Sequence, residues 1–102
     1  MDKSQAIRVT AILNPERCRQ FLTAHRVLCQ LADKDATIIC GSVPLCPDSV
    51  FIRVEAGDLV FRNTPLISAA IRTADAADFY PLTNGSIRME LTFHRMLLHC
   101  NV

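Results

Sequence analysis

Hydrophobic residues recur every three or four positions between Pro15 and about Asp33, which predicts one long amphipathic helix. Asn14 supplies an N-cap, and Pro15 suits the first helical position. The predicted core-facing stripe of this helix consists of Cys18, Phe21, Leu22, His25, Leu28, Cys29 and Ala32.

The opposite face of the same helix is polar and basic. It carries Arg19, Thr23, Arg26 and Gln30. Guanidinium groups without acidic partners suit phosphate or an acidic surface. A simply solvated helix face is the alternative interpretation.

Alternating apolar positions predict several strands. They are expected at Ala6–Leu13, Ala36–Gly41, Val50–Glu55, Leu59–Arg62 and Ser86–Thr92. We expect a turn at Ala56–Asp58 and another at Asn84-Gly85, a loop over Ser42–Ser49, and an irregular segment over Asp75–Pro81. For Leu66–Thr73 a strand is favoured over a short helix. Apolar residues between Phe93 and Cys100 predict a second helix, with Thr92 as its cap.

These elements predict an α+β fold, a two-layer sandwich with an antiparallel sheet and two helices on one face. The length of 102 residues suits a single domain spanning 1–102, and a hydrophobic fraction of 50% supports a core. The net charge of +1 provides no global basic field, so nucleic-acid binding would require local clustering.

The five cysteines form no CxxC pair, and no secretory signal or membrane span is visible, which favours reduced thiols in a nuclear or cytosolic compartment. Cys29 and His25 are four residues apart on one helix, but both belong to the predicted core stripe. No phosphate-binding glycine loop or nucleophile motif occurs. We therefore expect no catalytic activity, no cofactor, no metal site and no small-molecule substrate.

Three stretches resemble the first domain of a DNA sliding-clamp subunit, most closely the Hus-type subunit of the heterotrimeric DNA-damage checkpoint clamp. They are AIRVTAILNPERCRQFLTAHRVLCQLADKDATIIC, DFYPL and NGSIRMELTFHRMLLHC, together about 60 of the 102 residues. The resemblance implies a non-catalytic domain of a ring of clamp subunits that encircles duplex DNA, whatever its sequence, in nuclear checkpoint signalling and repair. The family subunit has two such domains, so the chain is expected to be the N-terminal part of a longer protein or a single-domain relative.

In such clamps, helices with basic residues line the ring. Carried over to this sequence, the DNA-facing residues are Arg19, Arg26 and Arg95, with Arg17, Thr23, Gln30 and Lys34 as further candidates. Two other hypotheses remain open. One is a small α+β protein-interaction module, an inhibitor or adaptor unrelated to DNA, and the other is a thiol or metal enzyme built on Cys and His groups.

Overall fold

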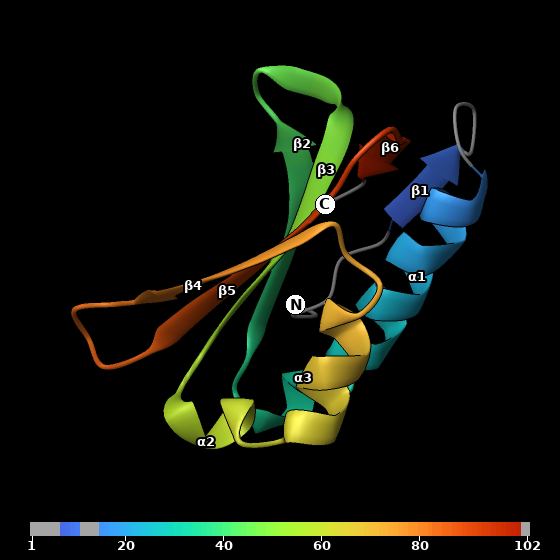
Figure 1. The fold of residues 1–102 in the computed structure, drawn as a ribbon. Coiled ribbons are helices and arrows are strands. Elements are labelled where there is room, and N and C mark those ends of the chain that lie inside the picture. The colour runs from blue at the N-terminus through green and yellow to red at the C-terminus, as the bar shows by residue number, and fades with distance from the viewer. Residues whose placement is uncertain (1–6, 11–14, 101–102) are drawn as a thin grey trace.

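The computed structural model describes residues 7–10 and 15–100, arranged as a sheet with helices on one side (Figure 1). The helices are α1 (Pro15–Cys29), the 3-10 turn η1 (Ala32–Lys34), α2 (Asp58–Phe61) and α3 (Thr64–Ile71). The strands are β1 (Ile7–Thr10), β2 (Thr37–Val43), β3 (Cys46–Ala56), β4 (Ala76–Pro81), β5 (Ile87–Phe93) and β6 (Leu97–Cys100).

The main sheet is four-stranded and antiparallel, in the order β2-β3-β5-β4. β1 and β6 form a separate two-stranded antiparallel sheet beside it, and β6 also contacts β3 and β2. α1 and α3 lie side by side and contact each other (Figure 1). The predicted α+β two-layer fold is therefore confirmed.

One hydrophobic core lies between the sheet and these helices. Alternation along the strands explains its sheet side, because every second residue of a strand points to the same face. The register aligns Ile38, Val54 and Met89 in one row and Cys40, Ile52 and Leu91 in the next. All of these side chains are buried.

The core stripe of α1 differs from the predicted one. Ala24 and Leu31 are fully buried, whereas Leu22 is 39% exposed and His25, Cys29 and Ala32 are only half-buried. The centre of the buried face is therefore rotated toward Ala24, and α3 packs against α1. The α-helix also ends at Cys29, and the turn η1 follows it.

Three secondary-structure predictions for the middle of the chain are wrong. The expected loop at Ser42–Ser49 is largely the tip of the β2–β3 hairpin, whose Val43 pairs with Cys46. The expected strand Leu59–Arg62 is the single-turn helix α2, and Leu66–Thr73 lies mostly in the helix α3. In α3, Ile67 and Ala70 are buried at helical spacing, a pattern that a short apolar run does not distinguish from a strand.

Two secondary-structure predictions for the C-terminal region are also wrong. Asp75–Pro81 is mostly the strand β4, whose exposure on both faces hides any alternation. The second helix predicted between Phe93 and Cys100 is instead the strand β6. Arg95 has a positive φ of 60°, and the N–H of Met96 donates to the Asp48 carbonyl, so the chain bends there and cannot continue as a helix.

Candidate nucleic-acid interface

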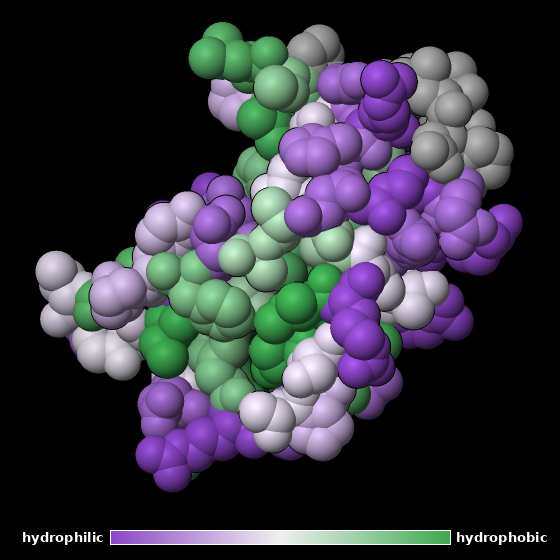
Figure 2. Space-filling model, viewed as in Figure 1, coloured by the Kyte–Doolittle hydropathy of each residue, from purple (hydrophilic) through white to green (hydrophobic). Residues whose placement is uncertain are grey.

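The solvent-facing side of α1 is hydrophilic (Figure 2). Arg19 and Arg26 are both exposed there, seven residues or about two helical turns apart, with Gln30 exposed at the end of the helix. Thr23 lies between them, and its hydroxyl donates to the Arg19 carbonyl at 2.9 Å. The predicted opposition of a basic and an apolar face is present for these four residues.

Arg19 has an acidic partner on the same helix, so the expectation of guanidinium groups without acidic partners is wrong for this residue. Its guanidinium forms an ion pair with Glu16, one turn earlier, and the two side chains are 69% and 60% exposed. An exposed pair of this kind contributes little free energy in water, about 0–1 kcal/mol. Arg19 can therefore exchange Glu16 for a phosphate, whereas Arg26 has no ion pair among the residues that the structure describes.

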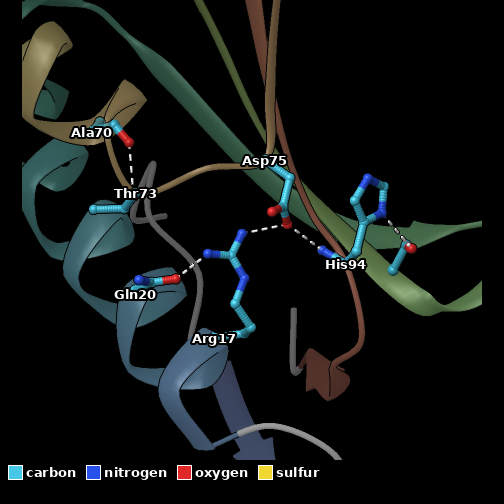
Figure 3. A network of polar contacts seen from close by, with 7 residues as sticks. Arg17, Gln20, Ala70, Thr73, Asp75 and His94 are labelled. Atoms are coloured by element: carbon cyan, nitrogen blue, oxygen red, sulfur yellow. Dashed lines mark hydrogen bonds and ion pairs between the residues drawn. The ribbon is translucent and has the colours of Figure 1, made fainter.

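Arg17 does not belong to the exposed face, contrary to its candidate role. Its guanidinium points inward, forms an ion pair with Asp75 and donates a hydrogen bond to the side-chain oxygen of Gln20 (Figure 3). It also lies 6.0 Å from the centre of the Phe93 ring. Its side chain is 20% exposed. The position that looks basic in sequence is thus neutralised by a carboxylate from a distant segment.

Asp75 is the centre of this polar cluster. It also accepts a hydrogen bond from the backbone N–H of His94 at 2.8 Å, while the His94 ring contacts the buried Ser49 hydroxyl at 2.9 Å (Figure 3). Burial alone would raise the pKa of Asp75, but the His94 hydrogen bond and the Arg17 charge outweigh burial and lower it. The cluster ties α1, the connection before β4 and the end of β5 together.

Sequence reasoning did not find this cluster. Ser49, Asp75 and His94 are far apart in the chain and form no motif, so only the fold brings them together. Because the Asp75 carboxylate contacts the His94 backbone rather than its ring, and Ser49 is buried, the three do not form a charge-relay arrangement of the kind used by serine nucleophiles.

Lys34 and Arg95 are exposed, but neither belongs to α1. Lys34 is in η1 between Asp33 and Asp35, which reduce the local positive charge. Arg95 lies at the bend between β5 and β6 rather than on the expected helix. The compact basic surface therefore reduces to Arg19 and Arg26 with the polar Thr23 and Gln30.

Among the described groups considered for thiol chemistry, His25 and Cys29 are half-buried neighbours on α1. The Cys29 sulfur lies 3.7 Å from His25 Nδ1, and burial lowers the pKa of His25. Burial also raises the pKa of Cys18 although the nearby Arg19 charge lowers it, so a smaller fraction of this thiol is present as the reactive thiolate. Among the described residues, no group of three or more metal-ligating side chains gathers, and no helix is long and apolar enough to cross a membrane.

Comparison of the chain with protein-family models, with curated proteins and with solved structures finds no match.

Proposed function

We propose that this chain is a non-catalytic, sliding-clamp-like domain that joins partner subunits in a ring around duplex DNA and acts in nuclear DNA-damage checkpoint signalling and repair. The observation that carries the proposal is the exposed pair Arg19 and Arg26, two turns apart on the solvent side of a helix whose other side packs on the sheet. The local resemblance of the sequence to clamp subunits provides the ring context.

The chemistry of this surface suits weak, sequence-independent contacts. Two guanidinium groups bind phosphates without reading bases, and the Glu16 carboxylate competes with phosphate for Arg19. Each phosphate contact releases counterions, so binding weakens as salt rises. A ring holds DNA by enclosing it, and weak contacts allow it to slide.

The ends of the sheet are the natural joints for partner subunits. β2 and β4 are the outer strands of the four-stranded order, and each presents one side that no strand of the main sheet covers. Exposed strand edges pair readily with strands of other chains. A ring could extend through these edges while the α1 surface stays free for DNA.

The test compares Arg19→Ala/Arg26→Ala with the charge-matched control Arg62→Ala/Arg72→Ala, whose arginines are exposed directly after α2 and α3. Binding to two labelled duplexes of unrelated sequence is measured by fluorescence anisotropy over a range of salt. We expect equal affinity for both sequences. The plot of log K against log salt should become shallower by about two for the α1 variant alone, because each lost phosphate contact removes ~0.9 from the slope.

An unchanged slope in the α1 variant, or an equal loss in the control, would contradict the DNA-lining role. Ring closure is tested separately with the tagged chain purified together with its natural partners. A ring stays on circular plasmid in high salt and is lost when the plasmid is linearised. Equal loss from both forms would contradict encirclement.

A second function, a protein-interaction module unrelated to DNA, is favoured by a different observation. Phe79 and Tyr80 lie on the outer strand β4 and are 50% and 44% exposed. Aromatic side chains are enriched in protein interfaces relative to the rest of the surface. If DNA binding is absent while association through β4 is intact, this second function replaces the first.

A further inference from the structure

The strand β4 forms an open edge of the main sheet. It pairs with β5 on one side, and no other described strand pairs with it. Five of its six residues are exposed, and the remaining one, Ala77, is half-buried. An unpaired strand edge is a template for another strand, and β4 lacks the charged lysines that often prevent such pairing.

The backbone groups at this edge can be assigned from the register. The N–H of Leu82 donates to the Ser86 carbonyl at 2.8 Å, and Tyr80 and Asp78 lie opposite Arg88 and Glu90. In an antiparallel pair, alternate residues direct their N–H and C=O groups to the partner strand. The residues between them, Ala77, Phe79 and Pro81, therefore direct theirs outward, and Pro81 offers only a carbonyl.

We propose that a second copy of this chain pairs with β4 in antiparallel register, centred on Phe79. Each Phe79 N–H then donates to the Phe79 carbonyl of the other copy, and each Ala77 N–H donates to the other Pro81 carbonyl. Ala77, near the start of one strand, has an N–H to donate, and Pro81, at the end of the other strand, has only a carbonyl to accept it. The missing N–H of Pro81 leaves only the Ala77 carbonyl without its strand partner, and that edge position remains accessible to water.

The side chains select the same register. On the helix side, Phe79 is half-exposed and its ring meets the Phe61 ring edge-on, 6.3 Å between centroids. Figure 2 shows apolar surface between β4 and the helices α2 and α3. Pairing at Phe79 sets the two Phe79 rings beside each other and extends this aromatic cluster across the interface.

Charge on the opposite face disfavours the neighbouring register that is centred on Asp78. Pairing centred on Asp78 would place the two Asp78 carboxylates directly opposite each other. Each Asp78 also lies opposite the acidic Glu90 within its own sheet, which adds to the negative charge there. Like charges directly across a strand pair are destabilising. The Phe79-centred register instead places each Asp78 opposite Tyr80 of the other copy, whose hydroxyl can donate to the carboxylate.

The resulting dimer has a defined geometry. A two-fold axis perpendicular to the sheet joins two four-stranded sheets into one, with the helices of both copies on the same side. Because one short strand pair buries less than the ~1,200 Å² of a standard interface, we expect a weak dimer, to be sought from micromolar to about 1 mM protein. The inference does not depend on DNA binding by Arg19 and Arg26, but a β4 edge paired with a second copy is closed to any other ring subunit.

The first test uses Ala77→Pro, which removes an outward N–H but no bond to β5. Sedimentation equilibrium of the full chain should show a monomer–dimer equilibrium. The variant should weaken it by about tenfold or more, since it removes both Ala77-to-Pro81 hydrogen bonds. Far-UV circular dichroism and thermal unfolding of the variant verify that the fold is retained.

Charge exchange at Phe79 provides a second readout that does not depend on the proline. Phe79→Lys and Phe79→Glu should each be monomeric, because like charges then face each other at the two-fold axis. A mixture of the two should restore a dimer containing one copy of each, detectable by native mass spectrometry. A variant that fails to fold shows no restoration, and its circular dichroism reveals the cause.

Register is tested by oxidative cross-linking in a Cys46→Ser background, since Cys46 is exposed. Phe79→Cys should form a disulfide with its own copy, because directly opposed Cα atoms of a hydrogen-bonded pair are ~5.5 Å apart, within disulfide range. Tyr80→Cys is the matched control and should cross-link far less, because Tyr80 faces Asp78 of the other copy.

Three results would overturn the proposal. They are a monomer at all concentrations, a dimer that tolerates Ala77→Pro and both charged Phe79 variants, and stronger cross-linking at Tyr80→Cys than at Phe79→Cys. A monomer that instead binds a strand of another protein at this edge also counts against a second copy as the occupant.

Discussion

At the scale of single residues, burial on α1 is decided by packing partners as much as by hydrophobicity. Phe21 is fully buried and its ring meets the Phe93 ring of β5 edge-on, 5.3 Å between centroids. The adjacent Leu22, equally hydrophobic in the sequence pattern, is 39% exposed. The small Ala24 is fully buried instead, since it allows α1 to approach its neighbours closely.

This contrast gives a paired prediction. Phe21→Ala should lower the free energy of unfolding by ~3–5 kcal/mol, because it removes a large buried ring and leaves a cavity. Leu22→Ala should lower it by about 1 kcal/mol or less, because much of that side chain already contacts water. Urea denaturation followed by circular dichroism measures both, and equal losses would show that the wrong face of α1 is buried.

At the scale of elements, turns and bends determine where helices and strands end. The β4–β5 hairpin closes with the Leu82–Ser86 pair, and Gly85 has a positive φ of 87° with nothing near its Cβ position. The Asn84-Gly85 turn was predicted correctly from the sequence, since glycine adopts this backbone region without a steric penalty.

A pair of substitutions at this turn isolates the backbone effect. Gly85→Ala should lower the free energy of unfolding by about 1 kcal/mol, because an L-residue in the left-handed region costs ~1–2 kcal/mol. Gly85→Asn should cost clearly less, because asparagine tolerates that region. Thermal or chemical denaturation compares the two, and an equal cost for both would point to a side-chain rather than a backbone cause.

At the scale of the whole molecule, the Arg17–Asp75 ion pair fastens α1 to the segment that connects α3 with β4 (Figure 3). The His94 N–H bonded to the same carboxylate adds the end of β5. Residues that are distant in sequence thus hold helix layer and sheet layer together at one end of the core.

The free energy that the Asp75 contacts contribute to folding should depend on pH. Asp75→Ala should lower the free energy of unfolding by about 1 kcal/mol near neutral pH, a modest effect because the Asp75 side chain is 32% exposed. The pKa of Asp75 is lowered in the folded protein, so its contribution is present above the unfolded value of 3.8 and is lost as pH falls through the folded value below it.

Denaturation curves of wild type and Asp75→Ala at a series of pH values measure this linkage. The difference between them should be constant at neutral pH and should narrow below about pH 3.8. Asp58→Ala is the control, because Asp58 forms an exposed pair with Arg62 and its removal should change stability by only about 0.5 kcal/mol. A pH-independent difference for Asp75 would rule out an ionic origin.

The sequence by itself determined the features that depend on local patterns. The helix from Pro15, the alternating strands Val50–Glu55 and Ser86–Thr92, the Asn84-Gly85 turn and the α+β class follow from periodicity and glycine chemistry, which act between neighbours in the chain. The predicted N-cap Asn14 lies outside the described residues. The exposure of Arg19 and Arg26 follows from the same helical period.

Only the tertiary structure decided the rest. Whether Leu66–Thr73 becomes helix or strand depends on packing against α1, and Leu97–Cys100 becomes a strand because β1 is available to pair with it. The positive charge of Arg17 is paired with the carboxylate of Asp75, which lies 58 positions further along the chain. Such contacts join groups that carry no shared local signal, since the free energy of an ion pair or a strand pair depends on distance in space rather than in sequence.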